Sequence, residues 1–257
     1  MRILIANDDG IASEGLRALA AACAARHEVY IAAPWHEQSG MAHALNVHRP
    51  IEVEEMPGVA LELGAVAAWR IAGTPTDCVK LALSMLLEKK PDIVMSGINA
   101  GPNVGPDILY SGTVGAATEA CHQGLASMAF SNDDESQTDI QSKARHAVAL
   151  AESIDWSRIP KGRVINVNYP KGPLTKNRGL RVCRQTTAVW KNDYLERRDP
   201  RGSRYWWLMG EIPPETINAG SDKDLLSRGF ITVTPLRFDF TDEDTIRVLD
   251  ALQLPEN

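Results

Sequence analysis

The amino-acid sequence predicts an α/β protein built on a mostly parallel β-sheet that is covered by helices on both faces. Short apolar runs alternate with helical patterns along most of the chain, and this order is typical of β-α-β units. The first apolar run, Ile3–Ala6, contains no polar residue, as expected of a strand buried on both faces of a parallel sheet. With 257 residues and 44% hydrophobic content, the chain can bury the core of one large domain, 1–257.

The spacing of apolar residues and the turn residues between them define the elements in the first half of the chain. Strands are bounded here by Gly, Pro or polar residues, and helices carry apolar residues three and four positions apart. In chain order we expect a strand at 3–6, a helix at 13–26 capped by Ser13, a strand at 28–33 ended by Pro34, strands at 47–54 and 59–63, a strand ending at Ile71, and a helix at 76–89 ended before Pro91.

The same alternation continues in the second half, around one long glycine-rich connection at 96–113. A loop of this length inside a compact domain is usually functional. The expected elements are a buried strand in DIVMS at 92–96, a helix at 114–123, a strand at 126–130, a helix at 140–154, a strand at 164–168, a strand in ITVTPLRFDFT at 231–241, and a short helix at 241–253.

The composition favours small ligands over nucleic acid or membranes as partners. A formal net charge of -6 disfavours general affinity for nucleic acid or for an anionic membrane surface. No apolar run approaches the roughly 20 residues that cross a bilayer, and the first strand lacks the pattern of a signal peptide. The four cysteines are scattered without a CxxC pair, so we expect the reducing cytoplasm as the location.

Four loops with small polar residues each follow a predicted strand: NDDG, APWHEQSG, GTPTDC and SGINAGPN. The carboxyl ends of parallel strands meet at one edge of a sheet, where such folds bind ligands. Asp8, Asp9, Ser39 and Asn99 would bring only oxygen donors to this edge, and hard cations such as Mg²⁺, Mn²⁺ or Ca²⁺ prefer oxygen. Two adjacent carboxylates also repel each other unless a proton or a cation lies between them. The alternative is an ordinary turn in which Asp9 caps the next helix.

A second candidate site lies where SGT leads into the helix expected at 114–123. Backbone N–H groups, hydroxyls and the helix dipole make such a turn a possible anion site, so we expect Asn103, Ser111, Gly112 and Thr113 to bind phosphate. The alternative is that Ser111 or Thr113 only caps the helix. The sequence contains neither GxxxxGK[ST] nor GxGxxG, which disfavours a P-loop and a dinucleotide site.

Histidines cluster near the second of these loops, at His36, His43 and His48. His43 is the one that can stand close to the metal candidates and serve as a proton donor. The alternative is that all three are solvated side chains of a polar loop. The sequence does not decide between these two interpretations.

The segment from Arg181 to Arg204 differs from the rest of the chain, with seven Arg or Lys against three Asp or Glu. Trp190, Trp206 and Trp207 lie in or beside it. Stacking aromatics in a basic groove are typical of single-stranded nucleic-acid binding, whereas aromatics and arginine are also enriched at protein interfaces. Because the whole chain is acidic, we favour an extended hairpin arm, at about 186–230, that packs against another subunit.

The sequence resembles the family of the stationary-phase survival protein SurE. The members of this family are metal-dependent nucleoside-monophosphate phosphatases. The matching segments span nearly the whole chain in the family's order and are MRILIANDDG, AP followed by QSG, GTPTDCVKLAL, SGINAGPNVGPDILYSGTVGAA and VTPLRFDFT. The resemblance implies a Rossmann-like, three-layer α/β/α core with a C-terminal hairpin arm. It also implies one divalent cation per subunit, release of phosphate from 5′- and 3′-nucleotides, and assembly into homodimers or homotetramers.

Transferred to this sequence, the family's metal ligands correspond to Asp8, Asp9, Ser39 and Asn99, and its phosphate-facing turn corresponds to 111–113. The chain departs from the family's usual pattern in HEQSGMAHALN, which affects the expected base preference and pocket shape. We therefore expect hydrolysis of nucleoside monophosphates, in which the cation neutralises phosphate oxygens and activates water.

Two alternatives to this function remain open from the sequence. Asp8 could act as a covalent nucleophile, although haloacid-dehalogenase-like enzymes place one residue between their two aspartates, and here they are adjacent. The chain could also be a non-catalytic regulator that binds nucleotides in the same pocket. An assay of phosphate release separates the second alternative from the first.

Overall fold

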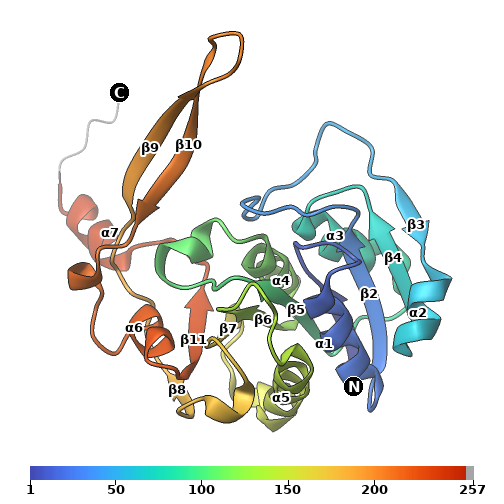
Figure 1. Ribbon diagram of the computed structural model, residues 1–257. Coiled ribbons are helices and arrows are strands. Elements are labelled where there is room, and N and C mark those ends of the chain that lie inside the picture. The colour runs from blue at the N-terminus through green and yellow to red at the C-terminus, as the bar shows by residue number, and fades with distance from the viewer. Residues whose placement is uncertain (253–257) are drawn as a thin grey trace.

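A central β-sheet organises the protein, and the computed structural model describes residues 1–252 (Figure 1). Among the adjacent strands of the sheet, two pairs are antiparallel and the other pairs are parallel. The predicted, mostly parallel sheet is therefore confirmed. Within the described residues the sheet has nine strands, which are, in spatial order, β3 (Val53–Glu55), β4 (Ala67–Ile71), β2 (Glu28–Pro34), β1 (Arg2–Ala6), β5 (Ile93–Ala100), β6 (Ala126–Asn132), β7 (Arg163–Tyr169), β11 (Ile231–Arg237) and β8 (Leu180–Val182).

Helices cover both faces of this sheet. One face packs against α1 (Glu14–Ala24), α2 (Pro57–Leu63) and α5 (Ile140–Ser153), and the other against α3 (Pro75–Leu81) and α4 (Gly112–His122). β1 contributes to both layers, because Ile3 and Ile5 belong to the core on the α1 side while Leu4 and Ala6 belong to the core on the α4 side. Fully burying a side chain such as Ile or Leu stabilises the fold by about 1.5–3 kcal/mol. The three-layer α/β/α architecture is thereby confirmed.

One predicted strand is wrong, because residues 59–63 are helical and belong to α2. Pro57 stands at the start of this helix, where its missing N–H costs nothing, and Gly64 ends it with a φ of 69°. Ala60 and Leu63, three positions apart, are its buried residues, which is helical spacing. The strand predicted at 47–54 is also much shorter, since only β3 forms there.

β5 is longer than predicted, because it continues past Ser96 to Ala100. Its pairing with β6 shifts register between Ser96 and Asn99. Such a bulge bends a strand and redirects the side chains that follow it. The first part of the predicted connection at 96–113 is therefore strand, and α4 begins at Gly112. The helix predicted at 76–89 is α3 followed by a π-helical turn, Ala82–Leu86.

A hairpin of β9 (Lys191–Arg198) and β10 (Arg204–Glu211) projects away from the body of the protein (Figure 1). Within the described residues its strands pair with each other and form a separate two-stranded sheet. Two short helices, α6 (Asp222–Ser227) and α7 (Glu243–Asp250), lie on either side of β11 in sequence. Among residues 1–252, no helix has the length and apolar character that crossing a membrane requires.

Candidate functional site

Asp8 and Asp9 lie directly beyond the carboxyl end of β1, at the point where the chain order of the sheet reverses. β1 pairs with β2 on one side and with β5 on the other, and such switch points form crevices for ligands. Asn7 shapes the turn, since its side-chain amide donates hydrogen bonds to the Gly10 carbonyl (3.0 Å) and to Ser13 Oγ (2.7 Å). The two carboxylates therefore lie at the edge of the sheet where ligand binding was predicted.

The carboxyl group of Asp8 is buried against the first turn of α4. Thr113 Oγ1 donates a hydrogen bond to Asp8 Oδ1. Gly112 lies so close that a Cβ there would stand 2.8 Å from Asp8 Cβ, which only glycine avoids. Burial raises the pKa of Asp8, and the hydrogen bond from Thr113 opposes that rise. The helix start and the strand end thus form one closely packed unit.

Asp9 is half-buried and faces the end of β5. Its Oδ2 accepts a hydrogen bond from the backbone N–H of Ala100 at 3.3 Å. Burial raises the pKa of Asp9 to about 7, and the negative charges of Asp8 and Glu37 add to the rise. Ionising both carboxylates is unfavourable without a positive charge nearby. A cation between them would supply that charge.

The segments that carry Ser39 and Asn99 both contact this pair. The backbone N–H of Gln38 donates to the carbonyl of Asp8 at 2.7 Å, and Ser39 follows on an exposed loop with its hydroxyl donating to Glu37. Asn99 is half-buried, and its amide nitrogen donates to the Gly101 carbonyl at 2.8 Å, which leaves its carbonyl oxygen as a donor to a cation.

The chemistry of these side chains fits a hard divalent cation. Two carboxylates, a hydroxyl and an amide carbonyl are all oxygen donors, the set that Mg²⁺, Mn²⁺ or Ca²⁺ prefers. Within residues 1–252, no group of three or more His, Cys, Asp or Glu residues is close enough to hold a metal ion. A cation at this edge would therefore need the neutral oxygens as well as the two carboxylates.

The predicted phosphate residues lie at the same end of α4. Ser111 Oγ accepts a hydrogen bond from the backbone N–H of Val114 at 3.1 Å, so Ser111 is the N-cap of the helix, as the alternative interpretation expected. Asn103 is buried, and its side-chain amide donates to Ser131 Oγ at 2.8 Å. Thr113 uses its hydroxyl on Asp8. A phosphate role for these residues stays a prediction.

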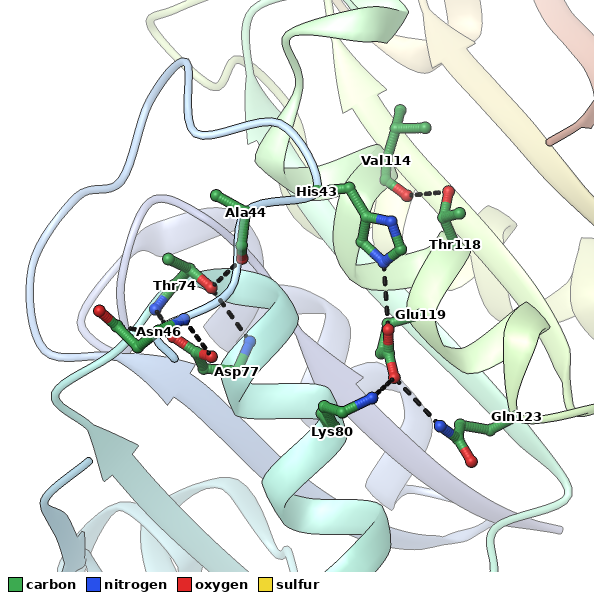
Figure 2. A network of polar contacts seen from close by, with 10 residues as sticks. All are labelled: His43, Ala44, Asn46, Thr74, Asp77, Lys80, Val114, Thr118, Glu119 and Gln123. Atoms are coloured by element: carbon green, nitrogen blue, oxygen red, sulfur yellow. Dashed lines mark hydrogen bonds and ion pairs between the residues drawn. The ribbon is translucent and has the colours of Figure 1, made fainter. Parts of the chain in front are cut away.

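A polar network that the sequence analysis missed joins residues 43–46 to α3 and α4 (Figure 2). Glu119 accepts hydrogen bonds from His43 Nε2 at 3.1 Å and from Lys80 Nζ at 2.9 Å. The imidazole of His43 therefore binds to α4 through Glu119. The available signal was a glutamate among the small residues of GAATEACH, a charge where a buried helix face is expected.

A cavity of about 140 Å³ lies along α4 beside the Ser111 turn. Its walls are mainly apolar and come from the helix, from the segment around His43, and from the chain after β11. Its lining includes Ser111, Val114, His122, Phe238 and Phe240. The cavity gives apolar surface next to the phosphate candidates.

Known proteins resemble this chain over nearly its full length. The family model for "Survival protein SurE" matches residues 3–192. A protein of Desulfovibrio desulfuricans named 5′-nucleotidase SurE is 56% identical over 260 residues, which cover 99% of each chain. A protein of the same name from Lawsonia intracellularis is 40% identical and covers 97% of this chain and 98% of its own. The crystal structure of SurE protein from Aquifex aeolicus has a TM-score of 0.83 at 32% identity, covering 97% of this chain and 100% of that one.

Proposed function

The chain belongs to the SurE family, and on this basis we propose that it is a 5′-nucleotidase that hydrolyses nucleoside 5′-monophosphates to nucleoside and inorganic phosphate. Relatives at 40% to 56% identity over nearly whole chains carry the name 5′-nucleotidase. The single observation in this structure that carries the proposal is the buried Asp8–Asp9 pair, packed against the start of α4 at the switch point of the sheet. In this arrangement the two carboxylates favour a bound cation, and the adjacent helix N-terminus favours a bound anion.

We further propose that the hydrolysis depends on one divalent cation per subunit. Asp8 and Asp9 would hold it, with Ser39 and Asn99 completing the oxygen ligands. When bound, the cation would supply positive charge that stabilises the negative oxygens of the phosphoryl group. The raised pKa of Asp9 supports this proposal, because burial and the neighbouring negative charges both disfavour its ionised form, and a bound cation would favour that form.

The remaining roles fall to the chain's own residues. The N-terminal turn of α4 presents backbone N–H groups and the positive end of the helix dipole, and with Asn103 it would orient the phosphoryl oxygens. Asp9 is less buried than Asp8, so it is the carboxylate that can orient a water molecule for attack on phosphorus. Positioning and electrostatic stabilisation supply most of the rate enhancement in such reactions.

Activity on 3′-nucleotides, self-association and location are also part of the proposal. The family resemblance supports 3′-activity, and the exposed aromatic side chains of the β9–β10 hairpin support a homodimer or homotetramer. The four cysteines carry free thiols, three of them buried, which fits the reducing cytoplasm.

A panel of 5′- and 3′-mononucleotides tests the function directly. Phosphate release is measured with Mn²⁺ or Mg²⁺, and again after addition of a chelator. We expect release from the 5′-monophosphates that stops with the chelator and resumes when excess metal is restored. Release that does not depend on metal would contradict the proposed role of the cation. No release from any nucleotide would contradict the proposed nucleotidase activity.

The covalent alternative is less well supported by the geometry. Asp8 is 4% exposed and its Oδ1 is already engaged by Thr113, so it is poorly placed to attack phosphorus. Treatment with hydroxylamine during turnover would trap an acyl-phosphate if one formed, and we expect none.

A further inference from the structure

The loop that carries Ser39 is fixed at both of its ends. We define the Ser39 loop as residues 38–46. At its start, the N–H of Gln38 donates to the carbonyl of Asp8 at 2.7 Å. Further along, the N–H of Ala42 donates to the carbonyl of Tyr110 at 3.0 Å. Ser39 lies between these two attachments and is exposed, so its position depends on where they hold the backbone.

The far end of the Ser39 loop is attached to two helices (Figure 2). On α3, Asp77 accepts hydrogen bonds from the backbone N–H of Asn46 at 3.0 Å and from its side-chain amide at 2.8 Å. Thr74 Oγ1 donates to the carbonyl of Ala44 at 2.7 Å. On α4, Glu119 accepts from His43 Nε2 at 3.1 Å. The loop is thus held on both sides by polar groups.

Glu119 is held firmly enough to act as an anchor. Its side chain is 5% exposed, and Lys80 Nζ at 2.9 Å and Gln123 Nε2 at 3.1 Å donate to the oxygen that His43 does not use. These hydrogen bonds, that of His43 first, lower the pKa of Glu119 to about 2 despite burial. The group is therefore a charged acceptor, and hydrogen bonds to charged groups are stronger than neutral ones.

α4 connects the Ser39 loop to the carboxylate pair. In its first turn, Thr113 donates to Asp8. Two residues later the loop lies directly against the helix, since a Cβ on Gly115 would stand 2.2 Å from the carbonyl oxygen of Ala42. Glu119 follows on the same helix and holds His43. One rigid element therefore fixes both the carboxylate of Asp8 and the loop that carries Ser39.

We propose that Glu119 is a positioning residue, which acts through His43 to hold the Ser39 loop in register with Asp8 and thereby sets the affinity of the site for its divalent cation. This inference rests on the proposed function, since Ser39 is a cation ligand only there. Glu119 does not itself contact the cation or the substrate. It acts at a distance, by removing freedom from a loop that would otherwise lose conformational entropy on binding.

Loosening the loop would weaken cation binding without changing the ligand groups. A contact worth about 1.4 kcal/mol changes an equilibrium constant about tenfold, and one charge-assisted hydrogen bond is of that size. His43→Ala removes the contact from the exposed side of the pair and leaves the buried carboxylate with Lys80 and Gln123. Glu119→Gln keeps the shape of the anchor and removes its charge.

The test is an isothermal titration of the full-length, metal-free protein with Mn²⁺ alone, in which calorimetry measures the affinity. We expect His43→Ala and Glu119→Gln each to bind Mn²⁺ about tenfold more weakly, and the double variant to be no worse than the poorer single one, since both changes act on the same contact. His43→Gln, whose amide can donate to the same carboxylate, should recover much of the affinity. In activity assays the half-saturating Mn²⁺ concentration should rise while kcat at saturating Mn²⁺ stays within about twofold.

Gln123→Ala is the matched control, because it removes a hydrogen bond to Glu119 without touching the loop. It should bind Mn²⁺ as the natural chain does. Wild-type Mn²⁺ affinity in His43→Ala, or an equal loss in Gln123→Ala, would overturn the inference while leaving the cation intact. Absence of Mn²⁺ binding by the unaltered protein would instead overturn the proposed function and the inference with it.

Discussion

The Asp8–Asp9 edge and the β9–β10 hairpin depart in opposite directions from the usual distribution of side chains. At the edge, the side chain of Asp8 is only 4% exposed although it lies beyond the end of a strand of the nine-stranded sheet. On the hairpin, Trp206 and Trp207 are 52% and 61% exposed on a sheet of two strands. Buried charges and exposed aromatic rings both cost free energy unless something else compensates. In the proposed function, a divalent cation compensates the first departure and a second subunit compensates the other.

The two regions also differ in what their loss would cost. The edge is built into the core of the fold, so changes there reach the chemistry through a few closely packed atoms. The hairpin pairs only with itself in the described residues and lies away from the sheet (Figure 1). We expect the edge to control turnover and the hairpin to control assembly, and four experiments can separate these roles.

Asp8→Asn should have the largest effect. It removes one negative charge while keeping the shape of the side chain, and loss of one preorganised electrostatic group typically lowers kcat by about 10²–10³-fold. Phosphate release from a nucleoside 5′-monophosphate at saturating Mn²⁺ measures this. Asp133→Asn, which changes a carboxyl group beyond the end of β6, is the matched control and should stay within about twofold. Activity of the Asp8 variant within tenfold of normal would remove Asp8 from the site.

Replacing Trp206 and Trp207 by Ser tests the hairpin. Aromatic anchors at interfaces contribute about 2 kcal/mol each, so loss of even one of the two should weaken self-association about 30-fold and give a smaller particle. Light scattering coupled to size exclusion gives the mass. Leu61→Ser, on the exposed face of α2, is the control and should leave the mass unchanged. An unchanged mass in the double variant, with lost binding of single-stranded nucleic acid, would favour the groove interpretation.

Asp9→Asn should stabilise the metal-free protein while lowering its activity. The change relieves repulsion between two neighbouring carboxylates, and such substitutions at functional sites commonly raise the free energy of unfolding by about 1 kcal/mol. Urea denaturation with a chelator present measures this gain. Added Mn²⁺ should stabilise the natural chain more than the variant. Equal turnover in the two proteins would show that Asp9 has no part in the reaction.

Glu119→Gln should have the smallest of the four effects. The pKa of Glu119 is shifted in the opposite direction from that of Asp9. Burial, together with the charges of Asp8 and Glu37, outweighs the hydrogen bond from the Ala100 N–H and raises the pKa of Asp9 to about 7. The partners of Glu119 instead lower its pKa to about 2, from an ordinary value of 4.5. The folded chain thus holds the Glu119 proton less tightly than the unfolded chain does. This carboxylate stabilises the fold above pH 4.5, and that stabilisation is lost as pH falls toward 2.

Glu119→Gln should therefore flatten the loss of stability in that window. The measurement is the free energy of unfolding by urea at a series of pH values between 4.5 and 2. Glu135→Gln, an exposed carboxylate, is the control and should keep the natural slope. A slope in Glu119→Gln as steep as in the natural chain would show that the network does not hold the carboxylate.

Much of the fold could be predicted because local signals and tertiary structure agree. The part of β1 from Ile3 to Ala6 is apolar and buried on both faces, and Ser13 caps α1 by accepting from the N–H of Leu16. The strand predicted at 59–63 is wrong because VALEL is a short apolar stretch that fits a strand or a helix equally well, whereas Pro57 and Gly64 mark the two ends of a helix. The end of β5 was missed because glycine in SGINA indicates a loop, whereas here it accommodates a bulge.

The site was only partly accessible to sequence reasoning. Asp8, Asp9 and Asn99 follow predicted strands, so the edge they share could be inferred from topology. The anchor of the Ser39 loop could not, because His43 and Glu119 are 76 residues apart and nothing local pairs them. Ser111 was open to two interpretations, and its contact with the N–H of Val114 identifies the cap without excluding an anion.

The spacing along α4 has a consequence for how this chain can vary. Thr113 and Glu119 are six positions apart, so their side chains point in directions that differ by about 120° around the helix axis. Insertion of a single residue between them would rotate one by about 100° and separate two contacts that now share a helix. The tip of the hairpin, at 199–203, is an exposed turn whose backbone N–H groups donate hydrogen bonds within the turn itself, and such sites tolerate insertions best. Among natural variants, length changes should therefore gather at that tip and be absent from the helix.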